Sequence, residues 1–216
     1  MTAAIRVRDL GLAPYAEVLA AMRDFTASRD ADTADEIWRV EHPPVYTLGL
    51  AGKREHLLDA GDVEVVQSDR GGQVTYHGPG QVIDYLLIDL RRRNLTIRGA
   101  VTRIEQAVID MLATLGVEAR RVTGAPGVYV NAPAGSPPPF EGLAKIAALG
   151  LKVSRGCTYH GVSLNVGMEL AAFDAINPCG YARLAVTDLQ HCGVDVEFAD
   201  AATLLEQALQ QQFPPT

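Results

Sequence analysis

The chain has 216 residues, 48% of them hydrophobic and 21% charged, and a formal net charge of −7 at pH 7. This composition is ordinary for one globular domain spanning residues 1–216. The negative charge argues against nucleic acid as a partner, because nucleic-acid binders normally carry a basic domain. No apolar run approaches the roughly 20 residues of a membrane span. Three cysteines are an odd number and too few for a disulfide framework, so we expect a cytoplasmic protein with no membrane partner.

Helix and strand patterns follow one another irregularly. Apolar residues at helical spacing predict helices over residues 14–28, 98–115 and 201–212, and a short one over 170–175. Strands are expected over 37–40, 45–48, 63–67, 73–76, 82–90, 128–130, 143–149, 151–153 and 161–166. This order lacks the regular alternation of a Rossmann domain. It predicts an α/β fold or α+β sandwich, in which helices flank a mixed sheet.

A glycine-rich segment runs from Arg70 to Gln81, with the sequence RGGQVTYHGPGQ. Its four glycines and one proline flank a short strand and allow the backbone to approach a ligand closely. Arg70 could hold a phosphate or carbonyl oxygen, and His77 could reach the reacting atoms. The segment has no Gly-Lys-Ser/Thr ending, so it is not a Walker loop. The alternative is an ordinary hairpin with a surface arginine.

A basic cluster, Arg91-Arg92-Arg93, stands out in this acidic chain. Such a run is typical of a solvated strand end. It could also be a docking patch for an acidic protein, because local charge steers partners even when the net charge is unfavourable.

Lys145 lies among small and apolar residues in the segment GLAKIAALG. In a regular strand it would share one face with Ala147 and Leu149, and a lysine on an apolar face requires a reason. The alternative is an exposed edge lysine that discourages aggregation.

Cys179 lies between a proline and a glycine in the segment Asn177-Pro178-Cys179-Gly180-Tyr181. Pro178 fixes its own φ and Gly180 permits unusual backbone conformations, so the turn can present a nucleophilic thiol. The amides of Cys179 and Gly180 are candidate donors to an oxyanion. The alternative is a small buried residue in an ordinary turn.

A zinc site is a second possibility, because Cys157, His160, Cys179, His191 and Cys192 are all of metal-ligand types. His191 and Cys192 are adjacent, however, and would point in opposite directions in an extended chain. No second spaced pair accompanies them, so we expect no metal and no cofactor.

Taken in order, the blocks Glu41–Gly49, Arg70–Gln81, Lys145–Gly150, Thr158–Val166 and Asn177–Tyr181 closely resemble the octanoyl-(acyl carrier protein):protein octanoyltransferases, also called lipoyl(octanoyl) transferases. The resemblance covers most of the chain and implies the fold of the biotin and lipoate ligase catalytic modules. The main departure from the family is the proline-rich stretch Ala132–Phe140, which we interpret as a longer loop.

The resemblance also implies roles for particular residues. Cys179 matches the cysteine that carries the acyl thioester, and Lys145 matches the essential lysine. The implied substrate-binding residues are Arg70, Gly71, Gly72, Gln73, Val74, Thr75, Tyr76, His77, Ala148, Leu149, Gly150, His160, Gly161, Val162 and Ser163.

In the implied reaction, Cys179 takes an octanoyl group from octanoyl-acyl carrier protein. The group then passes to a lysine of the lipoyl domains of 2-oxoacid dehydrogenase complexes and of the glycine cleavage H protein. A nearby Lys145 ammonium would favour the thiolate, and a neutral Lys145 could later act as general base. His77 and His160 are secondary candidates for proton transfer. An ATP-dependent lipoate or biotin ligase is the main alternative, and a non-catalytic binding module is a weaker one.

Overall fold

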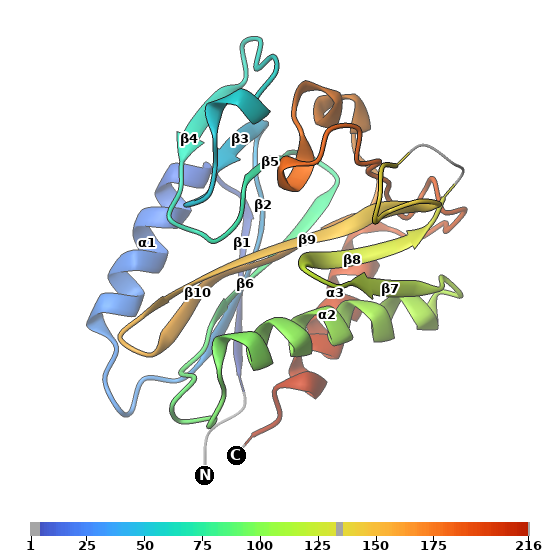
Figure 1. Ribbon diagram of the computed structural model, residues 1–216. Helices are drawn as coiled ribbons and strands as arrows, with labels where there is room; N and C mark the ends of the chain where they lie inside the picture. The colour runs from blue at the N-terminus through green and yellow to red at the C-terminus, as the bar shows by residue number, and fades with distance from the viewer. Residues whose placement is uncertain (1–4, 133–135, 216) are drawn as a thin grey trace.

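A seven-stranded sheet forms the centre of the fold in the computed structural model, which describes residues 5–132 and 136–215 (Figure 1). The strand order is β1-β2-β6-β10-β9-β8-β7. β1 runs parallel to β2, and all other neighbouring pairs are antiparallel. In sheet order the strands are β1 (Arg6–Leu12), β2 (Glu36–Glu41), β6 (Gln81–Leu87), β10 (Cys157–Asn165), β9 (Leu143–Ser154), β8 (Ala125–Asn131) and β7 (Ala119–Val122).

A second, three-stranded sheet packs beside the large one. Its order is β4 (Glu64–Gln67), β3 (Val45–Leu48) and β5 (Val74–His77), with β3 parallel to β4 and antiparallel to β5. The apolar side chains of this sheet share a core with Phe173 and Ile176. Phe173 belongs to the 3₁₀ turn η2 (Leu170–Ala175), and a second turn, η3 (Pro178–Gly180), follows it. Figure 1 shows the small sheet and both turns at the top of the molecule. Another 3₁₀ turn, η1 (Arg54–His56), lies between β3 and β4.

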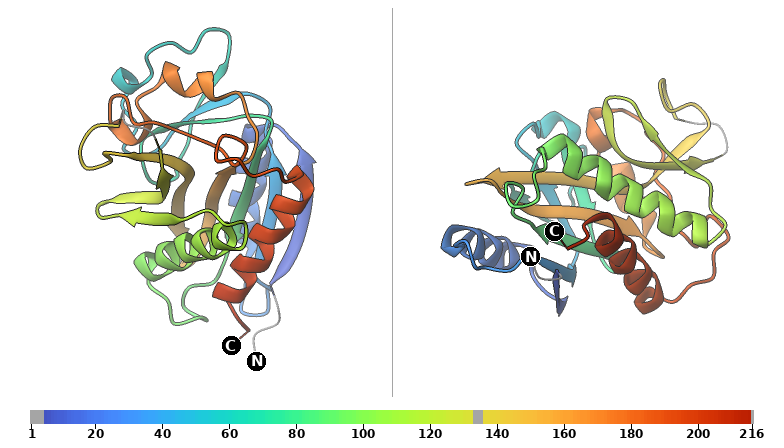
Figure 2. Two further views of the ribbon diagram at one scale, coloured as in Figure 1. Left: turned by 90° about the vertical axis from the view of Figure 1, so that its right-hand side faces the viewer. Right: turned by 90° about the horizontal axis from the view of Figure 1, so that it is seen from below.

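Helices cover both faces of the large sheet (Figures 1 and 2). Successive strand residues point to opposite faces, and β6 follows this rule. Ile83 and Tyr85 join the core under α1 (Tyr15–Ser28), whereas Val82 and Leu86 join the core under α2 (Ile97–Thr114) and α3 (Phe198–Gln212). The predicted mixed sheet with flanking helices is therefore confirmed. No helix in the described ranges is long and apolar enough to cross a membrane.

Two strands, β1 and β7, were missing from the expected elements, and both lie at edges of the large sheet. Most of their side chains are only partly buried or exposed, so neither strand shows a clear alternation of apolar and polar residues. The expected helix over 170–175 is a 3₁₀ turn. Of the proline-rich stretch Ala132–Phe140, residues 133–135 lie outside the described residues.

The strands expected on either side of Gly150 form the single strand β9. Glycine is required there because a Cβ atom would lie 2.7 Å from the carbonyl oxygen of Gly71, in the glycine-rich segment that crosses β9. β9 also contains a bulge. Val128 pairs with Ala147 and Tyr129 with Lys145, so Ile146 has no partner on β8. Bulges change the direction of neighbouring side chains, and this one adjoins Lys145.

The basic cluster does not form a three-residue docking patch, which corrects that alternative. The Arg93 side chain is only 2% exposed, and its Nε lies 2.6 Å from the Asp35 carboxylate. Its Nη1 donates to the carbonyl oxygens of Phe213 and Pro214 and so holds the end of α3. Arg93 therefore has a structural role, and of the three arginines only Arg91 is exposed.

Candidate active site

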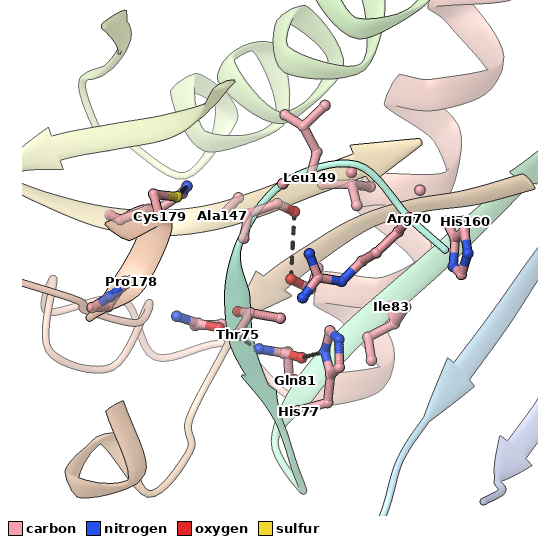
Figure 3. A pocket seen from close by; sticks show the side chains of 18 of the residues that line it. Arg70, Thr75, His77, Gln81, Ile83, Ala147, Leu149, His160, Pro178 and Cys179 are labelled. Atoms are coloured by element: carbon pink, nitrogen blue, oxygen red, sulfur yellow. Dashed lines mark hydrogen bonds between the residues drawn. The ribbon is translucent and has the colours of Figure 1, made fainter. Parts of the chain in front are cut away.

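A largely apolar cavity lies between the small sheet and strands β9 and β10 (Figure 3). Its empty volume is about 750 Å³, including its open mouth. Apolar lining residues come from six elements or loops: Val74, Ile83, Leu149, Val162, Phe173 and Val186. Cys179 lies at one end in Figure 3 and His160 at the opposite end, with Arg70 between them. The cavity thus offers an elongated apolar space that ends at a thiol.

The turn η3 holds Cys179 in an unusual backbone conformation. Its φ of 56° and ψ of 17° are left-handed, a conformation that costs a residue with a side chain about 1–3 kcal/mol and is enriched at functional sites. The turn is anchored from outside, because the Asn177 amide donates to the His56 carbonyl at 2.8 Å. Gly180 N–H donates to the Asn177 carbonyl at 2.9 Å. The Gly180 amide is therefore not available to an oxyanion, contrary to expectation, and the Cys179 amide remains the candidate.

Lys145 and Cys179 meet because the chain that follows η3 returns along β9. Lys145 N–H donates to Ala185 O at 2.8 Å, and Thr187 N–H donates to Lys145 O at 3.0 Å. Lys145 is only 4% exposed, which excludes the aggregation-blocking edge lysine. Its Nζ lies 2.8 Å from Cys179 Sγ. The structure thus brings together the two residues that the sequence singled out.

The Lys145 ammonium has two further neighbours, both from β8. Nζ donates to the carbonyl oxygen of Pro126 at 3.0 Å and lies 5.5 Å from the centre of the Tyr129 ring, within cation–π range. Burial raises the pKa of Tyr129, which therefore stays a neutral phenol that donates to Ala125 O. No carboxylate forms an ion pair with Lys145 among residues 5–132 and 136–215. Among the described residues, Cys179 Sγ is therefore the side-chain atom that accepts from Lys145 Nζ, and no carboxylate competes with it.

Arg70 lines the middle of the cavity and is buried, so it is not the surface arginine of the alternative interpretation. Its guanidinium donates to the Thr47 carbonyl and hydroxyl and to the Gly71 carbonyl. Burial lowers its pKa. No acidic side chain in the part of the chain that the structure describes pairs with it. Arg70 therefore places an unneutralised positive charge beside the cavity.

His77 and its neighbour His42 are neutral at physiological pH. Burial, with a smaller contribution from His42, lowers the pKa of His77 to about 3. Burial also lowers the pKa of His42 to about 4. His77 Nδ1 lies 2.7 Å from Gln81 Oε1, so Nδ1 carries the proton. With so low a pKa, His77 is a weak base.

His160 belongs to a separate polar network. Its Nε2 lies 2.8 Å from the Asp69 carboxylate, to which Tyr159 OH and Arg23 also donate. Burial lowers the pKa of His160, although its contact with Asp69 opposes the shift. Hydrogen bonds from His160 and Tyr159 outweigh desolvation and hold the pKa of Asp69 below its usual range. His160 therefore lies at the far end of the cavity from the thiol as a fixed neutral side chain (Figure 3).

Most of the predicted binding residues line the cavity. They are Arg70, Gly72, Gln73, Val74, Thr75, His77, Ala148, Leu149, Gly150, His160, Gly161, Val162 and Ser163. Gly71 and Tyr76 are not among the lining residues. The Tyr76 side chain packs in the core of the small sheet, and Gly71 N–H donates to Leu151 O. Binding of substrate by this set stays a prediction.

Sequence reasoning missed Gly127, which makes room for the lysine. Its φ is 140°, and a Cβ atom there would lie 2.5 Å from Lys145 Cε and 2.9 Å from Nζ. A glycine within a strand often marks such a close approach, and the segment Gly124-Ala125-Pro126-Gly127 carried that signal. Further lining residues that it missed are Tyr15, Gln81, Ile83, Tyr85, Asn165, Phe173, Pro178 and Val186.

The residues considered as alternative zinc ligands do not form a metal site in the described parts of the chain. Within residues 5–132 and 136–215, no group of three or more His, Cys, Asp or Glu side chains could hold a metal ion. The three cysteines are unpaired, and Cys157 is buried whereas Cys179 and Cys192 are partly exposed.

Residues 14–210 match the family of lipoyl protein ligase A/B catalytic domains, so fold and site define a catalytic domain of this class. Among its relatives, the octanoyltransferase of Thiobacillus denitrificans is 56% identical, over 95% of this chain and 89% of that protein. The octanoyltransferase of Methylococcus capsulatus is also 56% identical, over 96% of each chain. The chain belongs to the octanoyltransferases, which are acyltransferases of lipoate biosynthesis, as its sequence blocks indicated.

Solved structures agree on the fold. The bipartite lipoate protein ligase of the archaeon Thermoplasma acidophilum superimposes with a TM-score of 0.74 at 16% identity, over 97% of this chain and 84% of that one. The biotin protein ligase of Aquifex aeolicus gives a TM-score of 0.53 at 9% identity, over 99% of this chain and 69% of that one. The expected likeness to biotin and lipoate ligase modules is therefore confirmed at the level of the fold.

Proposed function

We propose that this protein transfers an octanoyl group from octanoyl-acyl carrier protein to a lysine of lipoyl domains, through a thioester on Cys179. The observation that carries the proposal is the 2.8 Å contact between Lys145 Nζ and Cys179 Sγ at one end of an apolar cavity. An octanoyl chain is apolar and its carbonyl must reach the nucleophile, so a cavity that ends at a thiol suits it.

In the first half-reaction, the Cys179 thiolate attacks the thioester carbonyl of the donor. A carbon–sulfur bond forms to Cys179, and the bond to the carrier's sulfur breaks. The Lys145 ammonium stabilises the attacking thiolate and then gives a proton to the leaving carrier thiolate. Lys145 is thereby left as a neutral amine beside an uncharged thioester.

In the second half-reaction, the acceptor lysine must lose its charge before it attacks. One of the two protons that it gives up passes to Lys145 and the other to water. The new amide forms, and the Cys179 thiolate returns beside the Lys145 ammonium. The thioester supplies the driving force, so no ATP is consumed. His77 is too weak a base for this step, and Figure 3 shows both His77 and His160 away from Cys179.

The partners that follow from this reaction are octanoyl-acyl carrier protein as donor and, as acceptors, the lipoyl domains of 2-oxoacid dehydrogenase complexes and the glycine cleavage H protein. We further propose that residues 1–216 form one catalytic domain, because the family match extends over residues 14–210. The unpaired state of all three cysteines supports a reducing compartment, and we propose the cytoplasm.

Incubation with octanoyl-acyl carrier protein, without ATP or added metal, is expected to attach one octanoyl group to Cys179. Intact-mass and peptide-level mass spectrometry would locate the group, and treatment with hydroxylamine should release it if the linkage is a thioester. A lipoyl domain added afterwards should take up the same group. Transfer that requires free octanoate and ATP would instead favour the ligase alternative, as would an enzyme that never becomes acylated.

The substitution Gly127→Ala is expected to slow transfer by about 10- to 100-fold, because the new methyl group would displace Lys145 Cε and Nζ. The matched control is Gly124→Ala in the same hairpin. Gly124 also has a positive φ, of 80°, but a Cβ atom there meets nothing within 4 Å. Both variants strain the backbone, so equal losses of transfer rate would show that strain alone is responsible.

A further inference from the structure

Helix α2 is connected to Lys145 by two hydrogen bonds that share one peptide group of β8. The peptide between Pro126 and Gly127 is bonded at both ends. Its carbonyl oxygen accepts from Lys145 Nζ at 3.0 Å, and its N–H donates to Glu105 Oε1 at 3.1 Å. The C=O and N–H groups of a trans peptide point in opposite directions. This peptide therefore lies between a carboxylate on one side and an ammonium on the other.

Glu105 is itself held in place. Its side chain is 8% exposed, and its second oxygen lies 3.0 Å from Arg121 Nε on β7. Arg121 also donates to Gln106 and to the carbonyl oxygen of Thr102, both on α2. The carboxylate is thus fixed in position beside the β7–β8 hairpin.

We propose that Glu105 is a positioning residue for Lys145, which acts by fixing the orientation of the Pro126–Gly127 peptide. The inference rests on the proposed role of Lys145 in the reaction. Rotation of this peptide would turn its N–H toward the ammonium and replace an attraction with a repulsion. Gly127 makes such rotation easy, since glycine has the widest range of backbone angles. The Glu105 carboxylate opposes it by accepting from the N–H, and bonds to charged groups at both ends polarise the peptide and strengthen each other.

The test measures the thiol directly and does not depend on octanoyl transfer. The rate at which iodoacetamide alkylates Cys179 follows its thiolate fraction. Peptide-level mass spectrometry over a range of pH would give this rate separately from those of Cys157 and Cys192. We expect Glu105→Ala to lower the alkylation rate of Cys179 at pH 7 by about three- to tenfold and to shift its pH profile upward, because Lys145 is no longer held against the sulfur.

Glu105→Gln should fall between wild type and Glu105→Ala, since an amide oxygen can still accept from the Gly127 N–H but has no charge. This variant also preserves the shape of the side chain if the alanine variant does not fold. The control is Asp200→Asn, which removes an exposed carboxylate from the first turn of α3, outside the Glu105 network, and should leave the profile unchanged.

The variant Lys145→Ala distinguishes a failure of the positioning role of Glu105 from a failure of the pairing between Lys145 and Cys179. If it shifts the alkylation profile and both Glu105 variants match wild type, the positioning role is wrong while the lysine–cysteine pair stands. If Lys145→Ala itself leaves the profile unchanged, the pairing in the proposed function fails, and the role of Glu105 fails with it. A lowered melting temperature in the Glu105 variants with an unchanged profile would show a purely structural role.

Discussion

Octanoyl transfer is expected to fall by more than about 10³-fold when Cys179 is replaced by serine. The serine hydroxyl has nearly the same size and fits the same turn, but the neighbouring ammonium of Lys145 cannot ionise it at neutral pH. Single-turnover assays with octanoyl-acyl carrier protein would measure the loss, and mass spectrometry should show no acylated enzyme.

The control for Cys179→Ser is the same substitution at Cys192, which is partly exposed and forms no part of the cavity lining. Burial raises the pKa of the Cys192 thiol, so it is a poor nucleophile. Cys192→Ser should transfer octanoyl groups at the wild-type rate. Full transfer by Cys179→Ser would reject the thioester mechanism.

Removal of the lysine is expected to slow both half-reactions. In the proposed mechanism, Lys145→Ala removes the ammonium that stabilises the thiolate and the base that takes a proton from the acceptor amine, so each step should slow by about 10²- to 10⁴-fold. Rapid-quench measurements of acylation, and of transfer from enzyme acylated in advance, would give the two rates separately. A loss confined to acylation would show that Lys145 serves only to ionise the thiol.

Two variants control for damage to the fold in the lysine experiment. Lys145→Met replaces a buried ammonium with an apolar side chain of similar length. Its stability in urea is expected to stay close to that of wild type, because the loss of the contacts with Pro126 O and Cys179 Sγ offsets the removal of a charge that must be desolvated. Lys152→Ala removes a partly exposed lysine from the same strand and should keep full activity. An unstable Lys145→Met would indicate that the lysine also supports the fold.

Much of the fold could be predicted from the sequence because its central elements carry strong patterns. β6 is buried along its whole length and was expected as a central strand from its apolar run. The edge strands β1 and β7 could not be predicted. Most of their side chains are partly or fully exposed, so their sequences lack the alternation of apolar and polar residues that identifies a strand. The continuity of β9 through Gly150 depends on a crossing segment more than 70 residues earlier, which no local pattern reports.

The residues of the candidate site also differ in whether a local sequence pattern could predict them. Cys179 could be singled out because its turn has a local signal in the flanking proline and glycine. Its contact with Lys145 could not be derived locally, because it depends on the pairing of Ala185 and Thr187 with β9. Glu105 gave no signal, since a glutamate in an amphipathic helix is most often solvated. Only the structure shows that its carboxylate faces the β8 hairpin.

The oxygen that accepts from Lys145 is the main-chain carbonyl of Pro126, so the hydrogen bond does not depend on the side chain at that position. Every amino acid supplies the same carbonyl, so position 126 can change its side chain without removing the acceptor. The neighbouring position 127 has no such freedom, because any side chain there would collide with the lysine. A saturation library of this hairpin should therefore recover many residues at position 126 and almost only glycine at position 127. Gly127, which takes no part in the proposed chemistry, would then be as restricted in sequence as a residue that does, because it leaves room for Lys145.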